Sequence, residues 1–154
     1  KDRDEHQFVV YDLVSRLARW GHASVSGTVV RSFGELEHLV AEITLEGQTP
    51  LDFEAVALEL HPTPALGVYP RSRAGLAWLR TIDPDGERHR FGAPFGIRVP
   101  GEPGRCVVAI RNVQYRHGEL SIWAGCGVVA QSRYEDEWQE VLDKIQTVRS
   151  TWGL

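Results

Sequence analysis

Apolar residues recur along this chain at two different spacings, which separate helical segments from extended ones. Where Val, Leu and Ile return every three to four residues, one face of a helix is apolar. This spacing predicts four helices, over residues 2–20, 51–60, 71–80 and 134–150. Gly21 follows the first of them, at a position where glycine commonly ends a helix. The last helix places five apolar residues on a single face: Trp138, Val141, Leu142, Ile145 and Val148.

Val- and Thr-rich runs between turn-forming residues predict the extended segments. Five strands are expected, over residues 24–32 (with a turn), 38–45, 92–99, 106–115 and 120–129. Residues 101–104 and 117–119 have the composition of hairpin turns, and residues 83–86 predict a further turn. Helices mixed with largely antiparallel strands indicate an α+β fold.

Composition is typical of one globular domain and excludes several classes of function. The chain has 154 residues, and its formal net charge of -4 argues against a nucleic-acid surface. No apolar run approaches the roughly 20 residues that span a bilayer, and Lys1–His6 is too charged for a secretory leader. We therefore expect neither a nucleic-acid partner nor a membrane span. Methionine is absent, so we expect the chain to be part of a larger polypeptide.

The two cysteines are too few for a disulfide framework or a metal-ligand cluster. Cys106 and Cys126 both lie in apolar runs that are predicted to be strands. A buried, reduced thiol is typical of such positions. We therefore expect a cytoplasmic protein.

Two pairs of carboxylates stand out in the predicted helices. Asp2 and Glu5 lie three residues apart in the first helix, and Glu137 and Glu140 have the same spacing in the last. This spacing places both carboxylates of a pair on one helical face, where they repel each other unless a cation or solvent offsets the charge. The pairs are either solvated acidic faces or ligands for a hard cation such as Mg²⁺.

Arg111, two glycines and Lys144 are the candidates for holding an anion. Arg111 interrupts an apolar run; its planar fork matches a carboxylate, although strand alternation would equally place it in solvent. Gly125 and Gly127 either bring backbone amides close to an anion or mark a bulge. Lys144 lies one helical turn after Glu140, so it is either an anion contact or half of an ion pair.

Several segments, taken in order, resemble those of the chorismate-binding enzymes, which include isochorismate, anthranilate, aminodeoxychorismate and salicylate synthases. Motifs that agree in both order and spacing are far more specific than a single match. The segments run nearly end to end: KDRDEH at 1–6, EHL at 37–39, ERHRFG at 87–92 followed by Gly96, AIR at 109–111, WAGCGVV at 123–129 and EWQEVLDK at 137–144. The resemblance implies that residues 1–154 are the C-terminal portion of a chorismate-binding domain, within the α/β sandwich of that family.

The segment HPTPAL at 61–66 is most similar to the isochorismate synthase branch. The aminating and salicylate-forming branches carry a different loop at this place. Phe91 also fits the isochorismate synthases of siderophore pathways, although the pathway stays open between siderophore, menaquinone and salicylate biosynthesis. Two departures from the family pattern, Val68 for a glycine and Cys126 for an alanine, bear on the shape of the pocket.

The resemblance implies a magnesium cofactor and chorismate as substrate. Glu140 would be a direct Mg²⁺ ligand, Glu5 would contribute from the opposite helix, and Glu137 and Asp2 would support them, so the two acidic helices should face one cleft. His38, which taken alone favours a structural role, would line the pocket near the ring. The residues implied in substrate binding are Arg111, Gly125, Gly127, Lys144, Ile110, Phe91 and Ala65.

In the implied reaction, water adds to C2 of chorismate while the C4 hydroxyl leaves. The lysine base and the glutamate acid belong to the N-terminal half of the family's fold, so no residue of this chain takes either role. We therefore expect the isolated chain to be inactive and the missing half to be its partner. The alternatives are another chorismate-utilising enzyme, or a catalytically silent fragment that binds only a ligand or its partner half.

Overall fold

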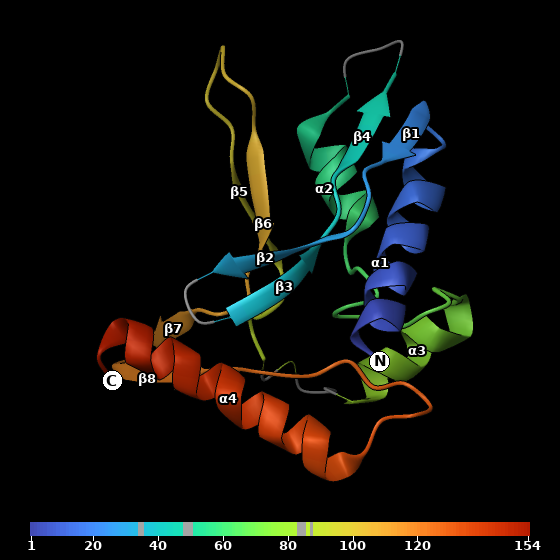
Figure 1. Ribbon diagram of the computed structural model, residues 1–154. Helices are drawn as coiled ribbons and strands as arrows, with labels where there is room; N and C mark the ends of the chain where they lie inside the picture. Colours follow the sequence, from blue (N-terminus) through green and yellow to red (C-terminus); the bar gives the residue numbers. More distant parts are fainter. Residues whose placement is uncertain (34–35, 48–50, 83–85, 87) are drawn as a thin grey trace. The chain divides into compact units, whose positions relative to one another are not determined.

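The computed structural model describes residues 1–154 except 34–35, 48–50, 83–85 and 87 (Figure 1). The expected turn at 83–86 and the first residue of the 87–92 motif therefore fall largely outside the described residues. The chain divides into two compact units, Lys1–Leu79 and Arg80–Leu154, and each is described by itself. Helices and antiparallel strand pairs occur in the chain, so the predicted α+β class is confirmed. Among the described residues, no helix is long and apolar enough to cross a membrane.

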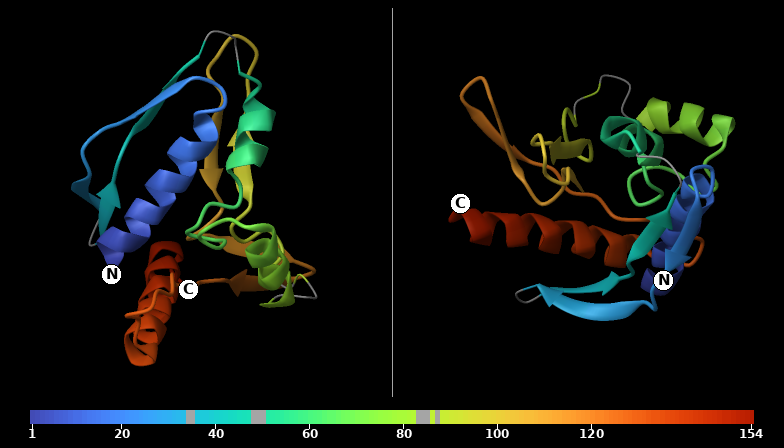
Figure 2. Two further views of the ribbon diagram at one scale, coloured as in Figure 1. Left: turned by 90° about the vertical axis from the view of Figure 1, so that its right-hand side faces the viewer. Right: turned by 90° about the horizontal axis from the view of Figure 1, so that it is seen from above.

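The first unit is built around helix α1 (Asp2–Leu17), which ends slightly earlier than predicted. The helix lies alongside an antiparallel hairpin and contacts its strands β1 (His22–Val25), β3 (Leu36–Val40) and β4 (Ile43–Glu46) (Figures 1 and 2). Strand β1 pairs with β4, and β2 (Val29–Phe33) pairs with β3. The hairpin thus forms one face of the unit against which α1 packs.

The two strands expected over 24–32 and 38–45 are each divided in two. The division falls at Ser26–Thr28 on one side and at Ala41–Glu42 on the other. There the amide of Glu42 donates to the Ser26 hydroxyl over 2.8 Å, and the Ser26 amide donates to the Glu42 carbonyl over 2.9 Å. A serine side chain has replaced a backbone group in the ladder, which interrupts regular pairing without separating the strands.

Two further helices belong wholly or mainly to the first unit, and both confirm the sequence-based prediction. Helix α2 (Phe53–Leu60) begins at Asp52, whose Oδ1 accepts a 2.9 Å hydrogen bond from the amide of Glu54, as an N-cap does. Helix α3 (Arg73–Ile82) follows the proline-rich loop. In that loop Tyr69 stacks on Phe8 of α1, with ring centroids 4.7 Å apart.

The second unit consists of two hairpins and a long terminal helix. Strands β5 (Pro94–Ile97) and β6 (Arg105–Val108) form one antiparallel pair, and β7 (Val113–Arg116) and β8 (Glu119–Ile122) form the other. The hairpins point in different directions (Figures 1 and 2). Both expected turns are present, and the second uses His117 and Gly118 with positive φ, as tight hairpins require. Helix α4 (Tyr134–Trp152) ends at Gly153 in the left-handed conformation.

The expected strand over 106–115 is wrong, because the chain turns sharply between β6 and β7. The ladder with β5 continues as far as Ala109, whose amide donates to the Ala93 carbonyl over 2.8 Å. The Ile110 amide then donates to the Val108 carbonyl over 2.8 Å, two residues back, and Arg111 follows with φ of 54°. Arg111 therefore lies in a tight turn between strands. The sequence had placed it inside a strand, facing either a ligand or solvent.

The expected strand over 120–129 ends at Ile122, so the glycine motif lies in a loop. The expectation of two buried thiols is also wrong, since Cys106 is exposed and Cys126 is half-buried in that loop. Few large apolar side chains are enclosed: among the described residues only Leu17 and Val148 are buried apolar positions. Leu17 belongs to the first unit and Val148 to the second, so each unit encloses only a small apolar core among the described residues.

Candidate metal and substrate site

The two carboxylates of the α4 pair differ in how deeply they are buried. Glu137 lies in the first turn of the helix and is only 6% exposed, whereas Glu140, one turn later, is half-buried. A buried carboxylate is costly unless something compensates its charge. The amino end of the helix dipole supplies part of that compensation for Glu137. The solvated acidic face that the sequence left open therefore does not describe Glu137.

Lys144 forms the ion pair with Glu140 that its spacing predicted, and it also reaches beyond the helix. Its ammonium contacts Glu140 Oε1 and donates a 2.8 Å hydrogen bond to the carbonyl of Gly125. The lysine thus ties the glycine loop to the face of α4 that carries the carboxylates. Because its ammonium already contacts two protein oxygens, the implied role of Lys144 in substrate binding stays a prediction.

Cys126 lies within reach of the same carboxylates. Burial raises the pKa of the Cys126 thiol above its ordinary value, and a hydrogen bond from the thiol to Glu137 raises it further. The charges of Glu137 and Glu140 act in the same direction, and Lys144 opposes them. The thiol is therefore held protonated beside two carboxylates, where it behaves as a neutral hydrogen-bond donor.

Arg111, in the turn between β6 and β7, lies near the Glu140 carboxylate. Burial lowers the pKa of its guanidinium, and the nearby Glu140 carboxylate raises it. Its Nε is buried and has no hydrogen-bond partner among the described residues. A buried guanidinium donor without an acceptor is unfavourable, and a planar carboxylate or phosphate would satisfy it. The turn therefore presents a cation suited to an anionic ligand.

The glycine loop leaves open space at Gly125, whose carbonyl accepts from Lys144. A Cβ at Gly125 would meet no heavy atom within 4 Å, so packing inside the unit does not require glycine there. Gly125 is exposed and Gly127 is half-buried. The second unit thus brings together, from three separate segments, six residues that the sequence singled out and one departure from the family pattern: Arg111, Gly125, Gly127, Glu137, Glu140, Lys144 and Cys126.

The remaining predicted site residues are spread over both units. Ile110 precedes Arg111 in its turn, and the amide of Phe91 donates to the Arg88 carbonyl over 2.9 Å at the entrance to β5. In the first unit, His38 lies exposed on β3, and Ala65 is exposed in the proline-rich loop.

Asp2 and Glu5 lie in the first turn of α1, where Lys1 Nζ is 3.6 Å from Glu5 Oε1. Each unit is defined by itself, so the meeting of the α1 and α4 carboxylates across one cleft stays a prediction.

The α4 pair fits the demands of Mg²⁺ better than those of a softer metal. Among the residues that the structure describes, no three His, Cys, Asp or Glu side chains gather closely enough to hold a metal by themselves. Mg²⁺ needs fewer protein ligands, because it is usually held by one or two carboxylates together with water and substrate oxygens. Glu137 and Glu140, one turn apart on a common face, supply ligands of that kind.

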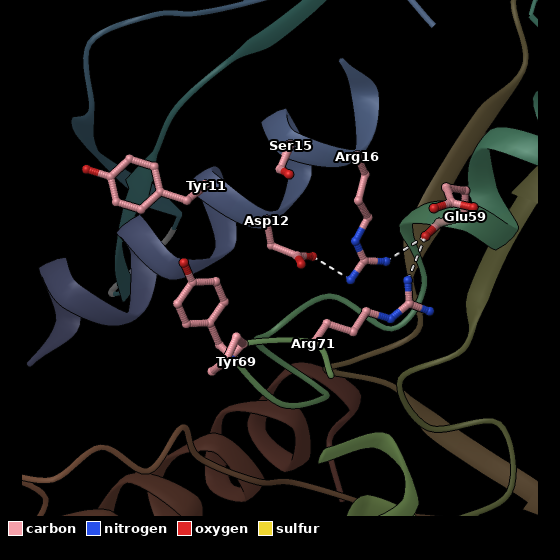
Figure 3. Close-up of a pocket in the computed structure, with 8 residues that line it drawn as sticks. Tyr11, Asp12, Ser15, Arg16, Glu59, Tyr69 and Arg71 are labelled. Atoms are coloured by element: carbon pink, nitrogen blue, oxygen red, sulfur yellow. Dashed lines mark hydrogen bonds and ion pairs between the residues drawn. The ribbon is translucent and has the colours of Figure 1, made fainter. Parts of the chain in front are cut away.

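Sequence reasoning missed a second charged cluster, which lies in the first unit (Figure 3). Asp12 and Arg16 of α1 form an ion pair of 2.6 Å, and both side chains are only 9% exposed. They border a cavity of about 430 Å³ that Arg71 also lines. The signal was present, since Asp12 and Arg16 are opposite charges four residues apart in a predicted helix. Nothing in the sequence, however, indicated that the pair is buried.

The departure at Val68 is accommodated inside the first unit. A Cβ at position 75 would lie 2.9 Å from Cγ1 of Val68, so the valine packs closely against the backbone of α3 at Gly75. The larger side chain at 68 is thus matched by the absence of one at 75.

Comparison with known proteins places these observations in a family. A family model described as chorismate binding enzyme matches residues 1–153. The chain belongs to the chorismate-binding enzyme family. The match spans all the segments from KDRDEH to EWQEVLDK, so the family that their order and spacing predicted is confirmed.

Two curated relatives with different activities are equally similar to the chain. The chain is 30% identical over 151 residues to the salicylate biosynthesis isochorismate synthase of Pseudomonas aeruginosa, covering 97% of the chain and 31% of that protein. It is also 30% identical over 151 residues to anthranilate synthase component 1 of Bacillus pumilus, covering 94% of the chain and 28% of that protein.

Among solved structures, the chain is similar to a crystal structure from Bacillus anthracis described as a putative 2,3-dihydroxybenzoate-specific isochorismate synthase, DhbC. The TM-score is 0.86 with 30% identity, over 98% of this chain and 40% of that one. The chain therefore spans well under half the length of the relatives that it matches.

Proposed function

We propose that the complete polypeptide carrying this chain is an isochorismate synthase, which isomerises chorismate to isochorismate in the presence of Mg²⁺. The observation that carries the proposal is the cluster of the second unit, where Arg111 and the open glycine loop stand beside the α4 carboxylates. A dicarboxylate such as chorismate requires cations and donors of this kind. The HPTPA segment and the isochorismate synthases among the relatives support this branch of the family.

In the proposal, Glu140 and Glu137 hold Mg²⁺ with Glu5 and Asp2 from α1. Two carboxylates that lie beside a cation-lined loop favour a metal shared with an anionic substrate. When bound, Mg²⁺ would neutralise a carboxylate of chorismate and help to orient it. Release of Glu140 from its ion pair with Lys144 would accompany metal binding and leave the lysine for the substrate.

The chain's own residues bind and orient the substrate in this proposal. Arg111 would accept a carboxylate in its fork, and its buried Nε would gain the partner that it lacks among the described residues. The amides near Gly125 and Gly127 would donate to the other carboxylate, in the space that a Cβ at 125 would fill. Holding both ends of the substrate fixes its ring for attack by water, which lowers the entropic part of the barrier.

The decisive experiment measures isochorismate formation by the complete polypeptide. We expect turnover of chorismate that chelation abolishes and Mg²⁺ restores. Glu140→Gln should raise the Mg²⁺ concentration for half-maximal activity, and excess Mg²⁺ should partly restore the rate. Glu135→Gln makes the same change at an exposed position of α4 and should behave as wild type. An unchanged Mg²⁺ titration for folded Glu140→Gln would contradict the metal assignment.

A second candidate function is another reaction of the family, which the similarity to anthranilate synthase component 1 favours. Product analysis with and without ammonia separates the two. An isochorismate synthase gives the same product under both conditions, whereas an aminating enzyme incorporates nitrogen. The 154-residue chain alone should give no product in either case, because the base and the acid are proposed to lie outside it.

We further propose a cytoplasmic enzyme that feeds siderophore or menaquinone biosynthesis. Both cysteines are free thiols, which suits a reducing compartment. Phe91 and the similarity to a putative 2,3-dihydroxybenzoate-specific enzyme favour the siderophore pathway.

A further inference from the structure

The hairpin of β5 and β6 (Figure 1) exposes three large apolar side chains on one of its faces. In an antiparallel pair, residues directly opposite each other share a face, as do residues two apart on one strand. Phe95 lies opposite Val107, and Ile97 lies two residues after Phe95, so these three residues form one patch, the Phe95 face. Their exposed fractions are 71% for Phe95, 65% for Ile97 and 62% for Val107.

The hairpin has little support from other helices and strands. Two isolated strands are marginally stable in water, and a stable sheet needs a further strand or a helix against its apolar face. Within the part of the chain that the structure describes, β5 and β6 pack closely only against each other. The opposite face presents smaller side chains, with Gly96 opposite Cys106. The Phe95 face is therefore the side of the hairpin that requires a partner.

The chemistry of this face defines what can cover it. Contiguous apolar patches that contain an aromatic residue are typical of surfaces that other protein segments cover. Arg105 lies opposite Ile97 at one end of the same face and is also exposed. The complementary surface is thus apolar opposite Phe95 and Val107, with a carboxylate or carbonyl oxygen at the Arg105 end.

The structural relative indicates where such a surface comes from. The crystal structure from Bacillus anthracis matches 98% of this chain with a TM-score of 0.86, and the match takes up only 40% of its own chain. The same fold therefore occurs in a polypeptide of which most lies outside the match. A segment of the same polypeptide stays at high effective concentration, whereas a second copy must bind from solution. An attached segment is therefore favoured over a second copy.

We propose that the Phe95 face is an internal docking surface, which binds an apolar segment of the complete polypeptide from outside residues 1–154. Burial of Phe95, Ile97 and Val107 against that segment removes apolar surface from water and stabilises the hairpin. The proposal concerns a surface of the fold and does not rest on the reaction that the polypeptide catalyses.

Photo-crosslinking in the complete polypeptide identifies what lies against this face. Phe95→p-benzoylphenylalanine keeps an aromatic ring and forms a covalent bond with its neighbour on irradiation. Mass spectrometry should map the bond to a peptide of the same chain outside residues 1–154. Tyr134→p-benzoylphenylalanine is the matched control, because Tyr134 is an aromatic residue of similar exposure, 75%, at the start of α4 beside two acidic residues. Position 134 should crosslink several times less.

Each of the other results overturns the proposal. A bond between two copies, which becomes more frequent as the protein concentration rises, makes the face a contact of a dimer. A bond to residues 1–79 shows that the first unit covers the face. Crosslinking at position 95 that is no greater than at position 134 shows that the face is open to solvent.

Thermal unfolding of the complete polypeptide gives a second test. Phe95→Ser and Val107→Ser should each lower Tm by roughly 5 °C or more, because each removes apolar contacts with the docked segment. Tyr134→Ser should stay within about 1 °C of wild type, as exposed substitutions do. A Phe95→Ser variant as stable as Tyr134→Ser overturns the proposal.

If the serine variants fail to fold, hydroxyl-radical labelling of the wild-type polypeptide decides. Phe95 should be oxidised several times more slowly in the folded chain than in the urea-unfolded chain, whereas Tyr134 should be oxidised at a similar rate in both. Equal protection of the two rings overturns the proposal. None of these measurements uses catalysis, so their outcome is independent of whether the polypeptide forms isochorismate.

Discussion

The two charged clusters of this chain use arginine in opposite ways. In the first unit, Arg16 and Arg71 donate to backbone carbonyls, and Arg16 also pairs with Asp12. In the second, Arg111 lies near Glu140, and its Nε is buried without a hydrogen-bond partner among the described residues. The Nε of Arg71 is also buried without a hydrogen-bond partner among the described residues, but both Nη atoms of Arg71 donate to backbone carbonyls. An arginine that donates to backbone carbonyls maintains the fold, whereas Arg111, which has no such contact among the described residues, is suited to an anionic ligand.

The largest loss of stability is expected when one partner of the buried ion pair is removed. Arg16→Ala leaves Asp12 buried without its partner and should lower the free energy of unfolding by about 3–5 kcal/mol. Lys144→Ala removes a partly exposed pair and should cost about 1 kcal/mol or less. Denaturant unfolding of the complete polypeptide, followed by circular dichroism, measures both. Equal losses would show that the two clusters do not differ in the way we describe.

Arg111 should matter for binding and not for stability. Arg111→Ala should weaken chorismate binding by roughly tenfold to a hundredfold, because a hydrogen bond to a charged group contributes about 1.5–3 kcal/mol. Arg111→Gly should lose the same affinity yet raise the free energy of unfolding by about 1 kcal/mol, because φ of 54° is strained for arginine. Substrate titration and thermal unfolding check the two halves. A variant that loses stability and affinity together would make Arg111 structural.

Gly21 in the first unit and Gly125 in the second differ in the space available for a side chain. At Gly21 a Cβ would overlap the Glu46 carbonyl oxygen and lie 2.9 Å from its carbon, so Gly21→Ala should destabilise by about 1–3 kcal/mol. At Gly125 a Cβ meets nothing within 4 Å, so Gly125→Ala should change stability by less than about 0.5 kcal/mol. Chorismate binding should nevertheless weaken in Gly125→Ala. Wild-type affinity there would show that the open space is not used by substrate.

The smallest effect concerns the two thiols. Cys106 is exposed, whereas burial and the neighbouring Glu137 and Glu140 raise the pKa of Cys126. A raised pKa means less thiolate at a given pH, so iodoacetamide should label Cys126 several times more slowly than Cys106 near pH 8. The difference should shrink as pH rises through the pKa of Cys126. Mass spectrometry locates the label, and Glu137→Gln should speed labelling of Cys126.

Elements that depend on local spacing could be predicted from the sequence, and the positions of their side chains could not. Helices α1, α2, α3 and α4 follow from the apolar periodicity within each segment. The predicted strand over 106–115 was wrong because a local hydrogen bond from the Ile110 amide to the Val108 carbonyl, followed by the positive φ of Arg111, turns the chain where its apolar composition suggested a continuous strand. The prediction of two continuous strands over 24–32 and 38–45 was wrong because Ser26 contacts Glu42 across the hairpin and interrupts both strands.

The α+β class, the helices and the family could be predicted from the sequence alone, because these rest on periodicity within a segment and on motifs of fixed order. The burial of Glu137, the hydrogen bond from Lys144 to Gly125 and the contact of Arg71 with the loop after α2 could not. Burial and long-range hydrogen bonds arise when distant segments meet, and a pattern along one segment carries no record of what it will face. For that reason the spacing of Asp12 and Arg16 revealed an ion pair, while its burial appeared only in the folded chain.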